Sequence, residues 1–401
     1  MKSCKQEIET EGRIIFINHT SQIGGAEVSL IGIVEGLSAC MKCEVVAFNE
    51  GPLTKILSLK GIKNHIIIAR GVGEIHHNSG TLSQMLLSLS FFNLFFKIRV
   101  YLQKGDVIYA NTQKALVLGS IIKAFSNNKL IWHIRDILGA SYYSRMQSNL
   151  IALLGSVFAD GVIANSEASR RSYQEQLGYR IGSSIRYIIW GTQAIDTVYD
   201  GIDLDSLNKK NQIEDLGIST PFCVGVFGRI TPLKNQLEAI KAIKEVDDTT
   251  LLIVGSAEGE SQYLKEIEEF IEAEGIQERV KLLGFKENVG DYIRCCDIIV
   301  HAGKGEEALG RTIIEAMLCR VPVIASAGDG PREIIDYGKT GILYNVDNHG
   351  MLKENIKFLL RDERYRAEIA NNAYLYAINN FDSTIINRKI IEFIERVLVK
   401  G

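Results

Sequence analysis

Short runs of four to eight apolar residues, rich in Ile and Val, alternate along most of the chain with segments whose apolar residues recur at helical spacing. This alternation is typical of parallel-sheet α/β domains, in which buried strands are joined by crossover helices. The first half contains expected strands at 13–19, 43–49, 65–70, 106–111, 130–133 and 161–165. The second half contains them at 222–227, 250–255, 280–284, 297–301, 321–326 and 340–344.

A polar stretch at 205–220 separates the two series and has the composition of an interdomain connection. Because 401 residues exceed one ordinary domain of about 150, we expect two doubly wound, Rossmann-like domains that face a central cleft. The first would span 1–205 and the second 206–380, followed by a C-terminal helix at 381–401. Whether that helix packs back on the first domain stays open at this point. Open α/β sheets bind ligands beyond the carboxyl ends of their strands, so residues there are the candidates for chemistry.

Composition narrows the class of protein further. The net charge of −3 and the pI of about 6.2 argue against a nucleic-acid-binding protein. Seven cysteines without framework spacing indicate a reducing compartment, and residues 1–11 lack the apolar core of an export signal, so we expect a cytoplasmic location.

The strongest candidate site is Glu307-Ala-Leu-Gly310-Arg311-Thr-Ile-Ile-Glu315, which follows a strand and opens a helix. Free amides near Gly310 and Arg311 at a helix start would bind an anion, and the absent side chain at Gly310 allows close approach. Glu315 could accept hydrogen bonds from a ribose diol, and Glu307 could hold sugar hydroxyls. The alternative is two solvated glutamates beside an ordinary helix.

Two further groups stand at comparable places. Arg229 and Lys234 lie five residues apart after the first strand of the second domain, a pairing suited to a diphosphate. Gly24 and Gly25 open the helix after the first strand of the chain, where backbone amides could touch a phosphate or a sugar. Surface charges and a simple tight turn are the respective alternatives.

In this order along almost the whole chain, the motifs resemble those of the retaining nucleotide-sugar glycosyltransferases of family 4, also called glycosyl transferases group 1, which have the GT-B fold. The matching segments are Gly24–Glu27, Trp132–Asp136 with its histidine, Ala164–Ser166, Asp200–Asp203, Gly228-Arg229 with Lys234, Glu307 with Glu315, and Gly338–Gly341. The chain has Asp200 where the family often has Asn, and Ala308-Leu309 where it usually has a pair ending in Phe. The second departure is expected to reshape the sugar pocket.

The resemblance implies roles for individual residues. Arg229 and Lys234 would bind the diphosphate of the donor, Glu315 its ribose and Glu307 the transferred sugar. His133 would contact the donor sugar or the reacting centre, with a satisfied strand-end histidine as the alternative. Transfer would proceed with retention through an oxocarbenium-like transition state.

We expect no metal or other cofactor beyond the nucleoside-diphosphate sugar, since two cations and a helix N-terminus can stabilise the leaving diphosphate. Asp203 and Asp205 match a metal-binding Asp-x-Asp motif, but they stand in the expected interdomain connection.

An unusually apolar stretch, 84–104, ends in Lys97, Arg99 and Lys104, and residues 79–145 hold eight Lys/Arg against two acids. Basic amphipathic surfaces attach to anionic membranes, so we weigh a peripheral contact with the inner face of a membrane against a buried helix. The acceptor would be a glycan or a lipid-linked saccharide. No nucleic acid is expected as a partner.

Three other functions compete with this interpretation. A dinucleotide-dependent oxidoreductase should carry Gly-x-Gly-x-x-Gly, whereas Gly71-Val-Gly73 is followed by Glu74, Ile75 and His76. A sugar-nucleotide epimerase of the same fold would convert the donor without an acceptor. A non-catalytic carbohydrate-binding protein would bind the donor without transfer.

Overall fold

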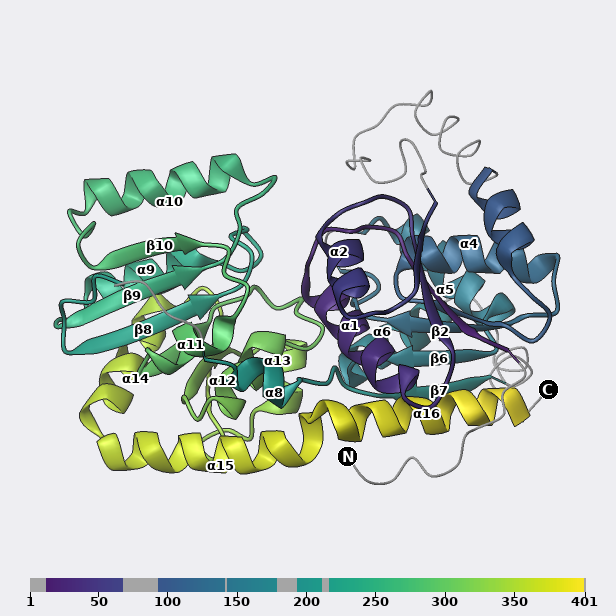
Figure 1. Ribbon diagram of the computed structural model, residues 1–401. Coiled ribbons are helices and arrows are strands. Elements are labelled where there is room, and N and C mark those ends of the chain that lie inside the picture. Colours follow the sequence, from purple (N-terminus) through teal and green to yellow (C-terminus); the bar gives the residue numbers. More distant parts are fainter. Residues whose placement is uncertain (1–11, 68–92, 141–142, 179–192, 211–215, 400–401) are drawn as a thin grey trace. The chain divides into compact units, whose positions relative to one another are not determined.

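The computed structural model describes residues 12–67, 93–140, 143–178, 193–210 and 216–399, which form two compact units (Figure 1). Unit 1 contains the chain up to Gly201 and returns from Ser383 onward, and unit 2 runs from Ile202 to Asp382. Each unit is built around a fully parallel sheet with helices on both faces. The predicted fold class, two doubly wound Rossmann-like halves, is confirmed.

Unit 1 has a seven-stranded sheet in the order β3-β2-β1-β4-β5-β6-β7. Its strands are β1 (Ile14–Asn18), β2 (Cys43–Ala47), β3 (Asn64–Ile66), β4 (Val107–Ala110), β5 (Lys129–Ile134), β6 (Gly161–Ala164) and β7 (Ala194–Thr197). Its helices are α1 (Gly25–Ser38), α2 (Pro52–Leu59), residues 93–101, α4 (Gln113–Ala124), α5 (Arg145–Phe158), α6 (Glu167–Gly178) and α16 (Ser383–Val399).

Two apolar cores cover the two faces of this sheet. One contains residues of the helix at 93–101 and of α4, α5 and α6, with Phe95 of the first helix packed in the same core as Trp132 of β5. The other joins α1 and α2 to α16, whose Ile390 and Phe393 are fully buried beside Leu30. The C-terminal helix is therefore an integral part of unit 1, although more than 180 residues of unit 2 precede it.

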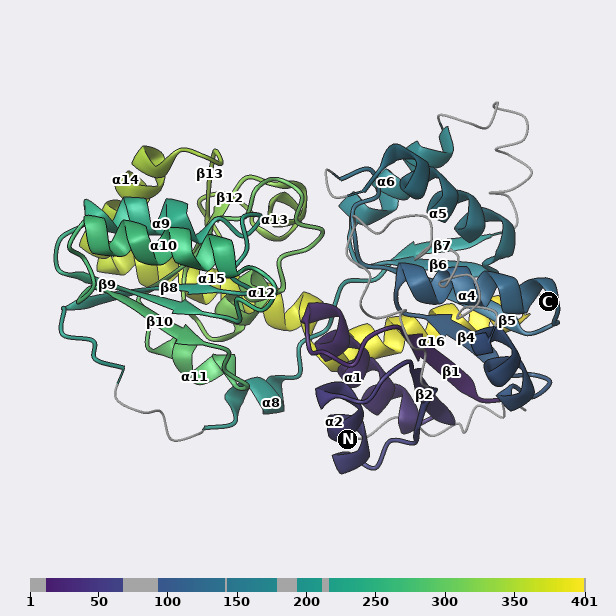
Figure 2. The same cartoon turned by 90° about the horizontal axis from the view of Figure 1, so that it is seen from above.

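Unit 2 has a six-stranded sheet in the order β10-β9-β8-β11-β12-β13. Its strands are β8 (Phe222–Phe227), β9 (Thr249–Val254), β10 (Val280–Gly284), β11 (Ile298–His301), β12 (Val323–Ser326) and β13 (Ile342–Tyr344). Its helices are α8 (Leu204–Asn208), α9 (Gln236–Lys244), α10 (Ser261–Ala273), α11 (Val289–Arg294), α12 (Arg311–Leu318), α13 (Asp329–Ile334), α14 (His349–Arg361) and α15 (Glu363–Phe381). Figure 2 shows α9 and α10 on one side of the strands.

One strand is absent from the sequence-based prediction. β7 pairs with β6 at the edge of the unit 1 sheet. It is short and contains the polar Asp196, whose carboxylate is paired with Arg396 of α16. A run interrupted by a charge does not look like a buried strand, and the cation that neutralises it is 200 residues away. Of the predicted strand 65–70, residues 68–70 lie outside the described chain.

Candidate active site

In unit 2, most of the predicted site residues follow β8 and β11, which are neighbours in the sheet. Arg229 and Lys234 stand in the loop between β8 and α9, and Glu307 lies between β11 and α12. Parallel strands end at one edge of a sheet, so these loops lie on the same edge. The sequence expectation that residues after strands gather there is met for Lys234 and Glu307, which are in direct contact.

Lys234, Glu307 and His301 form a charged cluster. Lys234 Nζ donates a hydrogen bond to Glu307 Oε2, and His301 Nε2 lies 3.6 Å from the same oxygen. Burial alone would raise the pKa of Glu307, but Lys234 and His301 outweigh it and hold that pKa well below its usual range. Glu307 is therefore a carboxylate at every physiological pH.

His301 is a residue that our reading of the motifs missed. It is 5% exposed and is the last residue of β11. The sequence does contain a signal for it. His301 is the one polar residue at the end of an otherwise apolar strand, a few residues before Glu307.

The start of α12 forms a second group on this edge. Gly310 precedes the helix with φ of 90°, a left-handed conformation that favours glycine, and a β-carbon there would lie 2.8 Å from Ile313 Cδ1. Arg311 Nε lies 3.3 Å from Glu315 Oε1 one turn along the helix. Burial raises the pKa of Glu315, and Arg311 opposes that shift. The group offers helix amides for an anion and a buried carboxyl group for hydroxyls.

Arg229 is exposed, and its guanidinium makes no ion pair with a residue in the described ranges. Its backbone is fixed, because Gln236 Nε2 donates to the Arg229 carbonyl at 2.8 Å. The structure thus brings Lys234 to Glu307 and Arg311 to Glu315, whereas Arg229 reaches neither pair directly. Its role stays a prediction.

In unit 1, His133 lies within β5 and is 1% exposed. The hydroxyl of Tyr109 lies 2.7 Å from His133 Nδ1, and Arg135 Nη2 lies 3.2 Å from it. Because arginine only donates, Nδ1 must be the acceptor, and the ring proton is on Nε2. Burial, and then the charge of Arg135, hold the pKa of His133 well below its usual value.

His133 Nε2 is buried and has no hydrogen-bond partner among the residues described. A buried N–H without a partner costs about 1–3 kcal/mol. The neutral ring is therefore a fixed donor with an unused proton, and it is a poor general base. This geometry suits a contact to a ligand oxygen, which is the role predicted for His133.

A chain of polar side chains follows the ends of β1, β4, β5 and β6 and supports His133. Asn111 Nδ2 donates to Asn18 Oδ1 at 2.9 Å, and Arg135 Nε donates to Asn111 Oδ1 at 3.0 Å. Arg135 is also paired with Asp200, and both side chains are only 6% exposed. Asn165 Nδ2 in turn donates to Asp200 at 3.2 Å. Sequence reasoning missed Asn18 and Asn111, because it placed both only as the polar ends of the expected strands 13–19 and 106–111.

The predicted Gly24-Gly25 turn joins the same chain. Gly24 N–H donates to Glu27 Oε2 at 3.1 Å, and Asn18 Nδ2 donates to Glu27 Oε1 at 3.1 Å. The Gly24 N–H is therefore already hydrogen-bonded to the Glu27 carboxylate. Any phosphate or sugar contact here would have to use the amides that follow, so the binding role of Gly24 and Gly25 stays a prediction.

Asp203 and Asp205 belong to a helix cap. Asp203 precedes α8, and its side chain accepts a hydrogen bond from the Asp205 amide at 3.0 Å. This contact gives the Asp203 side chain a structural role at the start of α8.

A family model described as "Glycosyl transferases group 1" matches residues 208–376. Over 201 residues, the chain is 28% identical to N-acetylgalactosamine-N,N'-diacetylbacillosaminyl-diphospho-undecaprenol 4-alpha-N-acetylgalactosaminyltransferase of Campylobacter jejuni, covering 50% of this chain and 53% of that one. It is 28% identical over 255 residues to phosphatidyl-myo-inositol mannosyltransferase of Mycobacterium leprae, covering 60% of each. The matches thus span little more than half of these curated relatives.

Among solved structures, HepE of Anabaena in complex with UDP and glucose has a TM-score of 0.82 and 30% identity, covering 96% of this chain and 100% of that one. HepE in complex with UDP-glucose has a TM-score of 0.82 and 29% identity, covering 96% of this chain and 99% of HepE. Sucrose-phosphate synthase of Thermosynechococcus elongatus, at 16% identity and a TM-score of 0.75, covers 97% of this chain and 100% of its own, and it shares the fold.

Proposed function

Because the chain belongs to the glycosyl transferases group 1 family and has the GT-B fold, we propose that it is a retaining glycosyltransferase. It moves a sugar from a nucleoside diphosphate to a glycan or lipid-linked acceptor in the synthesis of cell-surface polysaccharide or glycolipid. The observation that carries the proposal is the contact between Lys234 and Glu307 on the strand edge of unit 2. Two residues expected to serve one donor lie together there, although they are 73 positions apart.

The residues of unit 2 divide the donor between them in this proposal. Lys234 and Arg229 bind the diphosphate, with the first amides of α12 as further donors, and Glu315 binds the ribose. Glu307 binds hydroxyls of the transferred sugar. Since HepE binds UDP and UDP-glucose, we take a uridine diphosphate sugar as the donor to test first.

Donor binding requires Lys234 to leave Glu307. Their side chains are only 29% and 23% exposed, and the contact helps to hold the pKa of Glu307 well below its usual range. A diphosphate carries more negative charge than one carboxylate and so can replace Glu307 as the partner of Lys234. Glu307 keeps His301 as a neighbour and is released to accept hydrogen bonds from the sugar.

In the reaction, the bond between the anomeric carbon and the diphosphate oxygen breaks and the bond to the acceptor oxygen forms on the same face. The diphosphate leaves with the electron pair and takes the proton of the acceptor hydroxyl. The protein's task is to stabilise the negative charge that grows on the leaving group, which Lys234, Arg229 and α12 can do without a metal. His133 donates a hydrogen bond through Nε2 to the donor sugar or the reacting centre.

The proposal also includes a cytoplasmic location and a contact between residues 84–104 and an anionic membrane. Residues 84–92 lie outside the described chain. Of the rest, Phe95 is 8% exposed and packs in the core, whereas Phe96 is 52% exposed. No helix in the ranges described combines the length and apolarity needed to cross a bilayer.

A ligand screen tests the function directly. A nucleotide at 100 times its dissociation constant adds about 2.7 kcal/mol to the free energy of unfolding. We expect UDP or another nucleoside diphosphate to raise the melting temperature, and the matching sugar nucleotide to be consumed only with an acceptor. Conversion of the donor alone would indicate an epimerase, and binding without turnover a carbohydrate-binding protein. No stabilisation by any nucleotide would refute the proposal.

A further inference from the structure

The outer face of α5 exposes four large apolar side chains. Met146 is 76% exposed, Leu150 53%, Leu153 43% and Val157 57%. Their spacing of four, three and four residues places them on one side of the helix. The inward side carries small residues, among them Ala152, Gly155 and Ser156. Ile151, Leu154 and Phe158 pack partly against the core, so α5 carries large apolar residues on its outward side in addition to those on its inward side.

At Gly155 the inward side has no room for a larger residue. A β-carbon at Gly155 would lie 2.6 Å from Trp132 Cζ3, so the helix must lie close against β5. The four outer side chains are not needed for that packing. Four such residues on one helix form a patch, and exposed apolar patches mark interaction sites.

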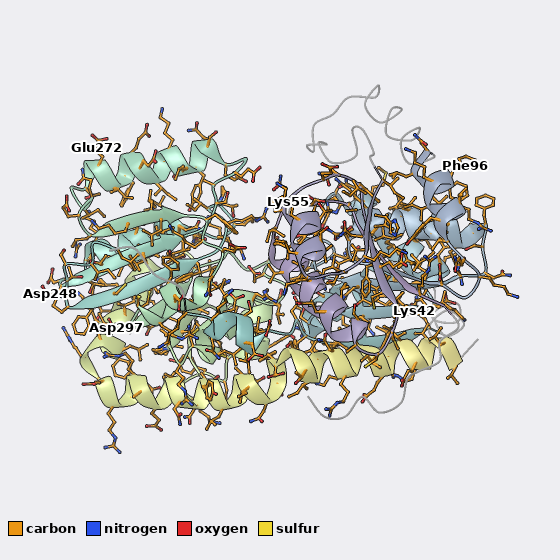
Figure 3. The ribbon with its side chains drawn as sticks, in the orientation of Figure 1. Lys42, Lys55, Phe96, Asp248, Glu272 and Asp297 are labelled. Atoms are coloured by element: carbon orange, nitrogen blue, oxygen red, sulfur yellow. The ribbon has the colours of Figure 1, made fainter. Side chains whose placement is uncertain are left out.

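Further exposed apolar residues lie in the same helical layer. The helix at 93–101, α4 and α5 lie side by side (Figure 2), and residues of all three share one core. Phe96 is 52% exposed, Val100 87%, and Phe125, just after α4, 70%. Figure 3 shows Phe96 on the outside of unit 1. Phe96 and Val100 also border a hollow of about 550 Å³, with Ile66 and Ile67 on its other side.

The net charge of this layer is positive. Residues 93–158 contain eight Lys/Arg and two Asp, a net charge of +6. Lys123 and Lys129 are paired with Asp160, and Arg135 with Asp200. The exposed Lys97, Arg99, Lys104 and Arg145 make no ion pair with any residue that the structure describes.

Apolar side chains among unpaired cations fit an anionic bilayer. A second copy of the chain would bring the same cations face to face, and residues 137–159 contain no acidic side chain to balance them. We propose that α5 and the exposed turns of the helix at 93–101 are a docking face for an anionic membrane, with the apolar side chains in the headgroup region. The proposal rests on the proposed function, since docking would bring the enzyme to a lipid-linked acceptor, and it adds a docking helix, α5, outside residues 84–104.

Flotation of the full chain with vesicles tests the docking face. Vesicles of phosphatidylcholine with phosphatidylglycerol should carry the protein upward, and vesicles of phosphatidylcholine alone should carry much less. Leu150→Ser/Leu153→Ser should weaken partitioning at least tenfold. Arg99→Gln/Arg145→Gln should weaken it about fivefold per cation at low salt, and less as salt is added.

Leu375→Ser is the matched control, because Leu375 is 51% exposed on α15 of unit 2. It should float like the wild type. Thermal melting and nucleotide stabilisation should be unchanged in all variants, which separates a failure of docking from a failure of the proposed function. Absence of wild-type binding to anionic vesicles would overturn the proposal, as would normal flotation of Leu150→Ser/Leu153→Ser. A wild-type dimer in light scattering that this double variant dissociates, without vesicle binding, would assign the stripe to a second copy instead.

Discussion

In both units the candidate residues lie at the carboxyl ends of parallel strands, but the side chains there differ in chemistry. In unit 1, amides and one deeply buried ion pair are linked in a chain from Asn18 to Asn165, and Arg135 and Asp200 are each 6% exposed. In unit 2, Lys234 and Glu307 form a separate pair that is 29% and 23% exposed. A linked, buried network fixes geometry, whereas a half-open pair can exchange one partner for a ligand. The network in unit 1 is suited to holding His133 in place. The pair in unit 2 is suited to contact with a charged ligand.

The largest effect should come from breaking the buried pair of unit 1. Arg135→Met leaves Asp200 buried without its cation, and removing one partner of such a pair costs about 3–5 kcal/mol. Urea unfolding followed by tryptophan fluorescence measures it, because Trp132 lies in the unit 1 core. Arg170→Met, which removes an exposed pair with Glu167, should cost about 0.5 kcal/mol or less. An equal loss in the free energy of unfolding in the two variants would show that the buried pair contributes no more than an exposed one.

In unit 2, the effect should fall on turnover rather than stability. Lys234→Ala and Arg229→Ala each remove a charge that we propose to stabilise the leaving diphosphate, and such a loss typically costs roughly 100-fold in rate, about 3 kcal/mol. Initial rates with the donor identified by the ligand screen give the values. Lys265→Ala, at an exposed position of α10, should leave the rate unchanged. Wild-type rates in Lys234→Ala and Arg229→Ala would remove the assignment.

A smaller effect should appear in the pH dependence of stability. The pKa of His133 is far lower in the folded than in the unfolded protein, where it is about 6.5, so the unfolded state binds the extra proton. His133 therefore reduces stability as the pH falls below about 6.5, by about 1 kcal/mol between pH 7 and 5.5. The free energy of unfolding of His133→Gln should fall less steeply over that range than that of the wild type.

His349→Gln, at an exposed position in the first turn of α14, is the control for that measurement. It should reproduce the wild-type slope. His19, whose pKa burial lowers to about 4, destabilises the wild type in the same direction, so only the difference between the slopes tests His133. Parallel slopes for wild type and His133→Gln would mean that His133 is not held neutral.

Removal of divalent metal ions is expected to have no effect on the transfer rate. Transfer should proceed at the same rate in excess chelator, because in the proposed mechanism positive charge and helix amides of unit 2 stabilise the leaving group. Loss of activity that magnesium or manganese restores would contradict this. It would also return attention to Asp203 and Asp205, whose observed contact is a helix cap.

The sequence predicts most of the fold because the buried strands of a doubly wound sheet are short apolar segments that are easily recognised. The failure at β7 has a physical reason, since β7 is a short edge strand whose Asp196 is 36% exposed and pairs with Arg396 of a helix far along the chain. The charged candidate residues can also be picked out one by one from the sequence. Their pairing cannot be predicted in this way, because Lys234 meets Glu307 through the packing of β8 beside β11. The network of Asn18 and Asn111 is harder still, since each residue alone has no distinctive signal.

The position of α16 in the unit 1 core has a consequence for protein synthesis. Leu30 and Ile163 share their apolar cluster with Ile390 and Phe393 of α16. The unit 1 core is therefore incomplete when the first 201 residues leave the ribosome. At about 5–20 residues per second, roughly 10–40 seconds pass before α16 is synthesised. During this time unit 2 is made and can fold, while the nascent first half exposes an apolar sheet face that invites chaperones or aggregation. Unit 2, made without interruption, has no such delay.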